Sequence, residues 1–341
     1  MGTRMKFQKS QPPANGMTRR EALRKSVLFS TGLLAAGWLG QAKAREPITQ
    51  LSPDGLHFLT VGDYGTGNDS QRAVARQMAE FSGKLGSPLT AVLALGDNFY
   101  GRLDPQRFEP HFEQMYSKKD FDCPFYACLG NHDYGPHYDA GQGPAKAQMQ
   151  LDYAKNNPSS RWKMPAKWYS VVLPSPENPL VKMIVLDGNY FEAALTPQEK
   201  LAQKRFLEAE LQKKTNARWQ WMVTHFPMFS QTTKRGNEAG MIKLWGKHLQ
   251  EHPFSLYISG HDHNLQHLRV ADYNPEFVVS GAGGAHLYDV GGDRGFYKKV
   301  LGFNHIHAGA EKLTVQFIDT EGLCLHAFER DRQGKVKILT S

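Results

Sequence analysis

Short apolar runs alternate with amphipathic stretches along the first half of the chain. The runs at 56–61, 89–95 and 125–129 predict three β-strands, because each is short, rich in branched or aromatic residues and followed by a glycine. The amphipathic stretches at 70–85 and 104–116 predict helices between them. Strands that alternate with helices indicate a layered α/β fold.

The second half continues the pattern. Thr196 and Glu199 match a capping box with Pro197 at the first helical position, which predicts a helix to about residue 214. Residues 134–164 are rich in glycine, proline and aromatics, so we expect a long loop over the strand ends. Further strands are expected at 219–224, 254–259, 313–318 and 323–328, the last two as an antiparallel hairpin.

Residues 1–44 are a segment of another kind. Arg19 and Arg20 belong to a twin-arginine pattern, an uncharged stretch follows at 26–40, and Ala42 and Ala44 form a small-x-small cleavage site. The apolar stretch is too short to span a bilayer comfortably. We therefore expect a signal peptide read by the twin-arginine export machinery. The mature domain, 45–341, would then be periplasmic or secreted in a bacterium, without a stable membrane anchor.

The net charge changes its meaning once that segment is set aside. The whole chain carries +8, but residues 1–44 hold eight Lys/Arg and one Asp/Glu. The remaining 33 basic and 32 acidic residues leave about +1, which is no argument for a nucleic-acid partner.

The three cysteines are an odd number for an exported protein. Cys123 and Cys128 lie five apart in a predicted strand and so point to opposite faces, which places them poorly for pairing. We expect buried free thiols, and any disulfide would be expected to involve Cys324.

Five short motifs stand at the ends of predicted strands. Asp63, Asp97 and Asn131 are each separated by 34 residues, the length of one strand–helix–strand unit. Parallel strands joined by right-handed crossovers bring such ends to one edge of a sheet, and we expect the glycines before them to permit sharp turns. The motifs are Gly62-Asp63-Tyr64-Gly65, Gly96-Asp97-Asn98-Phe99-Tyr100, Gly130-Asn131-His132-Asp133, Val223-Thr224-His225-Phe226-Pro227 and Gly260-His261-Asp262-His263.

The residue types in these motifs suit two metal ions. Hard anionic oxygens, which favour a trivalent iron, come from Asp63, Asp97 and Tyr100. Neutral donors, which favour a divalent ion, come from Asn131, His225 and His261. Because His261 and His263 are two positions apart, one can reach each ion, and Asp97 can bridge ions about 3.5–4 Å apart. Singly, each motif is equally typical of a turn or a helix cap; together and in order they predict a binuclear metal centre.

The motifs resemble those of the calcineurin-like metallophosphoesterases, and within them the purple acid phosphatases of the small tartrate-resistant type. The likeness covers essentially the whole mature chain and includes Asp97-Asn98-Phe99-Tyr100, Gly260-His261-Asp262-His263-Asn264-Leu265-Gln266, Ser280-Gly281-Ala282-Gly283 and Arg161-Trp162. It implies a single domain built as a layered β-sandwich flanked by helices.

The resemblance also implies a ligand set and an activity. It assigns Asp63, Asp97, Tyr100 and His263 to Fe(III), and Asp97, Asn131, His225 and His261 to a divalent ion (Fe, Zn or Mn). The ions would clamp a phosphate monoester and lower the pKa of a bound water, so that hydroxide is available in acid. One position departs from the family, which usually has glycine where Thr224 precedes His225, and the stiffer side chain is expected to shift His225 slightly.

Roles beyond the metal ligands are predicted less directly. His132 is the candidate to protonate the leaving group or to hydrogen-bond the phosphate; its alternative role is to orient the bridging carboxylate. Asp133 and Asp262 are expected to support ligands or cap turns rather than to react. Aromatic residues of the long loop could form a substrate wall, and His137 is a candidate for a substrate contact. Core packing is the alternative, above all for Trp168. The residues are Tyr134, His137, Tyr138, Trp162 and Trp168.

Two other functions remain open at this point. A phosphodiesterase or nucleotidase with two divalent metals would share the motifs, but Tyr100 argues against it. A metal-storage or phosphate-binding protein without turnover would not need His132 beside a complete ligand set. The sequence names neither the physiological substrate, the divalent metal nor the oligomeric state.

Overall fold

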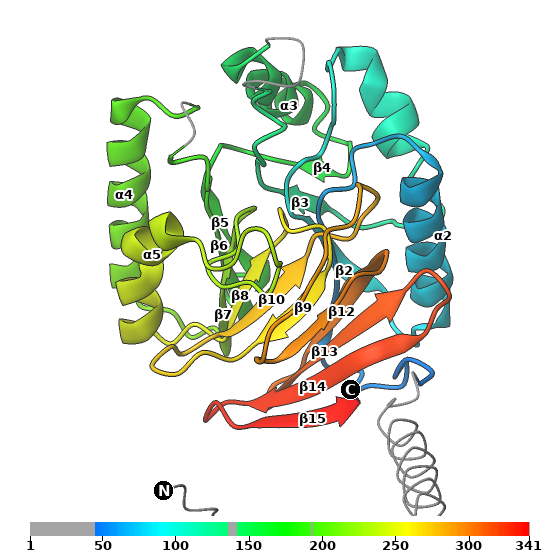
Figure 1. Ribbon diagram of the computed structural model, residues 1–341, viewed down its shortest axis with the longest axis vertical. Coiled ribbons are helices and arrows are strands. Elements are labelled where there is room, and N and C mark those ends of the chain that lie inside the picture. The colour runs from blue at the N-terminus through cyan, green and yellow to red at the C-terminus, as the bar shows by residue number, and fades with distance from the viewer. Residues whose placement is uncertain (1–44, 136–141, 192–193, 341) are drawn as a thin grey trace, which may run out of the picture. The chain divides into compact units, whose positions relative to one another are not determined.

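The computed structural model describes residues 45–135, 142–191 and 194–340. The expected signal peptide, together with His137 and Tyr138, lies outside the described residues. In residues 45–340, two β-sheets pack face to face with helices on their outer sides (Figure 1).

The larger sheet has eight strands in the order β15-β14-β13-β12-β1-β2-β3-β4. Strands β1 to β4 run parallel, and β12 pairs antiparallel with β1, so that the C-terminal strands extend the sheet as a meander. The strands are β1 (Leu56–Val61), β2 (Leu89–Ala94), β3 (Phe125–Ala127), β4 (Trp162–Lys163), β12 (Gly302–Ala308), β13 (Lys312–Asp319), β14 (Cys324–Asp331) and β15 (Val336–Thr340).

The second sheet has seven strands in the order β11-β9-β10-β8-β7-β6-β5. Its centre, β6, β7, β8 and β10, is parallel, while β5, β9 and β11 are antiparallel to their neighbours. The strands are β5 (Tyr169–Pro174), β6 (Pro179–Val185), β7 (Trp219–Val223), β8 (Leu256–Ser259), β9 (Leu265–Leu268), β10 (Glu276–Ser280) and β11 (Phe296–Lys298).

Three hydrophobic core clusters of the described residues lie between the sheets and helices. Helix α2 (Asp69–Lys84) covers one face of the larger sheet, and α4 (Pro197–Gln212) and α5 (Ala239–Glu251) cover the second sheet on the opposite side (Figure 1). Strand alternation divides the residues between cores: Phe58 of β1 faces the second sheet, whereas Leu59 packs toward α2. The predicted layered α/β sandwich is therefore confirmed.

The stretch predicted to be helical, 104–116, is helical in the structure, but it is not a continuous α-helix. A 3₁₀ turn, η1 (Pro105–Arg107), is followed by a short π-helix, η2 (Glu109–Glu113). Pro110 lacks a backbone N–H, so it cannot continue the helical hydrogen bonds from η1 as a regular α-helix would, and the Gln114 N–H bonds to the Glu109 carbonyl.

The predicted loop at 134–164 is wrong. It contains helix α3 (Pro144–Asn156), which begins with proline in the first helical position. Two of the three buried residues of α3, Lys146 and Gln150, are polar. The larger apolar residues of α3 that pack against the core are only partly buried, so the apolar periodicity of this segment is weak.

The cysteine prediction is confirmed: all three are buried and free. Cys123 lies in the core below α2 and Cys128 in the core between the sheets, as expected for opposite strand faces. Among the described residues, the structure has no helix long and apolar enough to cross a membrane.

Candidate metal centre

The seven residues predicted as ligands come together where strands of both sheets end. Asp63 follows β1, Asp97 and Tyr100 follow β2, and Asn131 follows β3. The three histidines follow strands of the second sheet: His225 after β7, and His261 and His263 after β8. The sandwich thus brings ligand candidates from two separate parallel sheet segments to one place.

Four of these side chains form one group. The Tyr100 hydroxyl lies 3.1 Å from Asp97 Oδ2, 3.3 Å from His263 Nε2 and 3.5 Å from Asp63 Oδ1. His263 Nε2 is 3.2 Å from Asp63 Oδ1. The other oxygen of Asp63 accepts a hydrogen bond from the main-chain N–H of His261 at 2.7 Å. This is the set that the resemblance assigns to Fe(III).

The second group adjoins the first through Asp97. His225 Nε2 lies 3.2 Å from Asn131 Oδ1 and 3.5 Å from Asp97 Oδ1, and His261 Nδ1 lies 2.9 Å from Asn131 Oδ1. The two ring nitrogens are 3.2 Å apart. Burial, with His225 and Arg235 nearby, lowers the pKa of His261 well below its usual value, which keeps the ring neutral and able to bind a metal.

Two histidines are oriented by main-chain carbonyls. His225 Nδ1 donates to the Leu95 carbonyl at 2.7 Å, and His263 Nδ1 donates to the His286 carbonyl at 2.6 Å. In each ring Nδ1 is thereby occupied by a hydrogen bond to the main chain, so that Nε2 is the nitrogen that faces the group of ligand atoms.

The pKa values of Asp63 and Tyr100 show that this group of side chains is suited to binding cations. Burial would raise the pKa of Asp63, but His225 and His263 beside it lower the pKa below the usual carboxyl value. Burial and the carboxylates of Asp97 and Asp63 raise the pKa of Tyr100 well above its usual value. A tyrosinate therefore requires a strong cation at its oxygen. Asp63, Asp97 and His225 also offer ligand atoms that all lie within 4.8 Å of one another, and the donor set fits a pair of metal ions.

The backbone under the ligands is strained and closely packed. Asp63, Asp97 and His261 have left-handed φ angles of 57°, 51° and 65°, which cost roughly 1–2 kcal/mol each for residues with a Cβ. Of the four glycines that precede ligand candidates in the motifs, Gly96 alone has a positive φ. Elsewhere the need for glycine is space: a Cβ on Gly130 would stand 2.3 Å from the Asp97 backbone nitrogen.

His132 and Asp133 connect the motifs. The main-chain N–H of His132 donates to Asp97 Oδ1 at 2.8 Å, and the rings of His132 and Tyr100 lie 4.6 Å apart. Asp133 is fully buried and accepts hydrogen bonds from the main-chain N–H groups of Asn98 and Gly130. Burial and the charge of Asp97 raise the pKa of Asp133 to about 6. Its geometry is that of a support for the ligand loops, as predicted.

Thr224 is fully buried before His225, where the family usually has glycine. Gly188 makes room for it, because a Cβ there would lie 2.8 Å from Thr224 Oγ1. The main-chain N–H of Thr224 bonds to the Ile258 carbonyl at 3.1 Å, so this residue is held within the strand-end geometry.

Four supporting residues were not predicted. Asp187 accepts from the Tyr134 hydroxyl at 2.6 Å, and Asn189 donates to the Leu129 carbonyl at 3.2 Å under the Asn131 loop. An apolar run also precedes Asp187, but the glycine comes after the aspartate rather than before it, so the motif that marked Asp63 and Asp97 is absent there.

The other two border the histidines. The Arg235 guanidinium contacts His261 Nε2, lies 4.8 Å from the centre of the Tyr288 ring, and is 3.7 Å from Asp262 Oδ1. Tyr288 stacks on His263 with ring centres 4.1 Å apart. Nothing in the local sequence marks either residue. Asp262, with Ser230 and Arg235 as partners, supports this region as expected.

Three of the aromatic residues predicted for a substrate wall pack in the core instead. Tyr134 and Trp162 are buried in the core below α2, and Trp168 packs against that core. A cavity of about 330 Å³ does border the centre, lined in part by Lys234, Arg235 and Tyr288.

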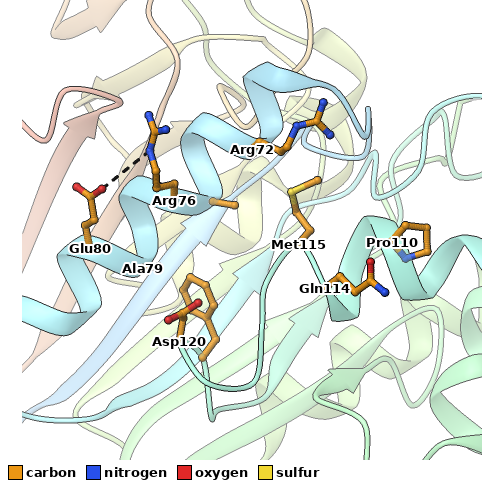
Figure 2. A pocket seen from close by; sticks show the side chains of 10 residues that line it. Arg72, Arg76, Ala79, Glu80, Pro110, Gln114, Met115 and Asp120 are labelled. Carbon is orange, nitrogen blue, oxygen red and sulfur yellow. Dashed lines mark ion pairs between the residues drawn. The ribbon is translucent and has the colours of Figure 1, made fainter.

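A groove of about 740 Å³ lies apart from these ligands, between α2 and residues 110–121 (Figure 2). Arg72 and Arg76 line it from α2, and Met115 lies across from them. Arg72 is paired with Asp69 and Arg76 with Glu80 on the exposed face of the helix. We regard it as a solvated surface groove.

Comparison with known proteins agrees with this site. Residues 56–265 match the model of the calcineurin-like phosphoesterases, and the chain belongs to that family. It is 28% identical over 302 residues to purple acid phosphatase 4 of Arabidopsis thaliana, covering 82% of this chain and 85% of the relative. It is also 28% identical over 313 residues to tartrate-resistant acid phosphatase type 5 of Sus scrofa, covering 82% and 88%.

A solved structure extends the comparison of folds. GAP50, described as the anchor in the inner membrane complex of Plasmodium, aligns with a TM-score of 0.68 at 20% identity over 81% of this chain and 89% of that one. The family, the acid phosphatase relatives and the buried metal-binding group together make this chain a metal-dependent phosphoesterase of the purple acid phosphatase group.

Proposed function

We propose that this protein is an exported acid phosphatase that hydrolyses phosphate monoesters at a binuclear Fe(III)–M(II) centre. The observation that carries the proposal is the position of the Tyr100 hydroxyl, within 3.5 Å of Asp63, Asp97 and His263. A phenol held among two carboxylates and an imidazole is a donor set for a hard trivalent ion.

The ligands divide between the ions as the two groups of side chains suggest. Asp63, Tyr100 and His263 would hold Fe(III), and Asn131, His225 and His261 would hold the divalent ion, with Asp97 between them. When bound, the pair supplies positive charge that neutralises phosphate oxygens and makes water acidic enough to attack in acid.

Residues of the chain would do the rest. His132 would give a proton to the leaving oxygen; the position of its ring, 4.6 Å from the ring of Tyr100, supports this role. Arg235, 37% exposed beside His261, is placed to bind a phosphate oxygen by charge-assisted hydrogen bonds.

Two alternatives remain as outcomes of experiment. A phosphodiesterase or nucleotidase with two divalent metals would use the same histidines and carboxylates but would not need a tyrosinate. A protein that binds without turnover is the less favoured alternative, although the likeness to GAP50 shows that this fold also occurs in a protein described as an anchor.

The test is colour together with activity. Purified protein should contain iron, hydrolyse nitrophenyl phosphate in acid, and show a visible tyrosinate–iron absorption band. Tyr100→Phe should bleach that band, whereas Tyr126→Phe, a matched change on the neighbouring strand β3, should keep it. A colourless wild type with full metal and full activity would leave the two-divalent-metal enzyme; full metal without turnover would leave the binding protein.

A further inference from the structure

The side chain of Lys146 is completely buried next to the proposed metal centre. Its ammonium donates to three main-chain carbonyls: Phe99 at 2.8 Å, Gly101 at 2.6 Å and His132 at 2.6 Å. Phe99 and Gly101 are the two neighbours of Tyr100. One side chain therefore holds the chain on both sides of the proposed iron ligand and also the residue proposed as the acid.

The position of this lysine is costly in isolation. It lies in the first turn of α3 (Pro144–Asn156), where the helix dipole disfavours a cation. Burying an ammonium is also unfavourable unless its protons are matched by acceptors. The three carbonyls provide that match, but leucine or methionine would fill the space without any such requirement.

A second residue on the same face of α3 repeats the arrangement. Gln150, one helical turn after Lys146, accepts from Asn98 Nδ2 at 3.0 Å and donates to Asp133 Oδ1 at 2.9 Å. It too joins the segment after β2 to the segment after β3. The polar residues Lys146 and Gln150 thus contact the two ligand-bearing loops, beside the apolar residues of α3 that pack against the hydrophobic core.

We propose that Lys146 is a positioning residue that fixes the Tyr100 and His132 segments relative to each other. The rings of these residues lie 4.6 Å apart, and neither segment is a regular strand or helix. Without the ammonium, the two loops would keep the hydrogen bonds that Asp97, Asp133 and Gln150 make between them, but would lose the link between the carbonyls beside Tyr100 and the carbonyl of His132. The consequence for catalysis rests on the proposed function; the anchoring itself does not.

The experiment compares Lys146→Met with Lys182→Met. Lys182 is also buried, and it donates to the Glu210 carbonyl at 2.9 Å and pairs with the Glu210 carboxylate at 3.0 Å, between β6 and α4. Both changes remove a buried ammonium, so both should lower the denaturation midpoint. Hydrogen exchange in the native protein should speed up at 97–103 and 130–135 in Lys146→Met only.

Activity gives the second measurement. With metal at saturation, Lys146→Met should lower kcat for nitrophenyl phosphate about 10–100-fold, the usual effect of disturbing the partners of metal ligands. It should also shift the wavelength of the tyrosinate–iron absorption band, compared at equal iron content. Lys182→Met should have the kcat and the absorption band of the wild type. If Lys146→Met fails to fold, Lys146→Gln and Lys182→Gln replace the pair, since the amide keeps part of the hydrogen bonding.

Two results would separate the possible failures. Exchange and kcat in Lys146→Met that match those of Lys182→Met would overturn the positioning role. A wild type without phosphatase activity would instead contradict the proposed function, and the exchange at 97–103 and 130–135 would still decide whether Lys146 anchors the two loops.

Discussion

Asp97 connects the two groups of proposed ligands, and its environment is set at the scale of single atoms. Asp97 Oδ2 accepts a hydrogen bond from the Tyr100 hydroxyl at 3.1 Å. Asp97 Oδ1 accepts one from the main-chain N–H of His132 at 2.8 Å and lies 3.5 Å from His225 Nε2. The main-chain N–H of His132 thus already contacts Asp97, the carboxylate that the alternative role predicted for His132 would orient. A change of the His132 side chain preserves that bond.

His132→Asn should therefore separate acid catalysis from support of the metal site. If the ring protonates the leaving oxygen, kcat should fall ~10²–10⁴-fold for an alkyl phosphate and much less for a nitrophenyl ester, whose leaving group needs no proton. Both rates should be measured at saturating metal, with metal content checked in each protein. Equal losses on the two substrates with metal intact would exclude the acid role.

At the scale of elements, α4 shows how local sequence sets a helix boundary. The Glu199 N–H donates to the Thr196 hydroxyl at 3.2 Å, and the Thr196 N–H donates to the Glu199 carboxylate at 2.8 Å, which completes the predicted capping box. Lys167 adds an ion pair with Glu199 at 2.7 Å.

Thr196→Ala should lower the free energy of unfolding by about 1 kcal/mol, because an N-terminal donor of α4 loses its acceptor. Thr196→Ser retains the hydroxyl and should be close to wild type. Urea unfolding would measure the difference, and kcat should be the same in all three proteins. An unchanged midpoint in Thr196→Ala would mean that the cap adds nothing to the stability of the fold.

At the scale of the whole molecule, the sandwich buries several histidines away from the metal centre. His57 and His305 lie on paired strands β1 and β12 with ring nitrogens 3.1 Å apart, and both are buried. Burial, and then His307, lowers the pKa of His57 to about 4. Burial, and then His267, lowers the pKa of His326 to about 3. Each stays neutral in the folded protein where it would be charged in the unfolded chain.

This burial predicts loss of stability in acid. Above a pH of about 6.5, the pKa of histidine in the unfolded chain, His57 is neutral in both the folded and the unfolded state and does not lower the free energy of unfolding. As the pH falls from there toward 4, only the unfolded chain takes up the proton, so the folded state loses on the order of 1–3 kcal/mol at this site. In His57→Gln, the urea concentration at the midpoint of unfolding should fall less steeply than in wild type as the pH is lowered from about 6.5 to about 4. Parallel curves for wild type and variant would contradict this assignment.

Export, proposed from residues 1–44, concerns the protein's place in the cell. Replacing both Arg19 and Arg20 by lysine should leave the precursor in the cytoplasm, because the pathway reads the arginine pair. Arg24→Lys, a change of the same kind outside the pair, should leave export intact. Fractionation with N-terminal sequencing would measure this; normal mature protein beginning at Arg45 in the double variant would refute the route.

Local sequence predicted the five strands that lead to the proposed ligands, β1, β2, β3, β7 and β8, because a short apolar run followed by a polar residue is written in consecutive positions. Of the other strands, only the hairpin of β13 and β14 was predicted. Asp63, Asp97 and Asn131 could be named as neighbours since parallel strands with crossovers have few possible arrangements. Asp187 was missed because it directly follows its apolar run, without the intervening glycine that marked Asp63 and Asp97.

Tertiary structure alone decided what holds the ligands. Lys146, Arg235 and Tyr288 reach the centre from helices and loops far along the chain, and their partners are backbone carbonyls or rings that no residue pattern specifies. Helix α3 was missed because hydrophobic periodicity detects a face that packs on apolar core, whereas Lys146 and Gln150 pack on polar loops. The ligand types were determined by the sequence; their distances depend on how two sheets, each with its own strand ends, meet in the folded protein.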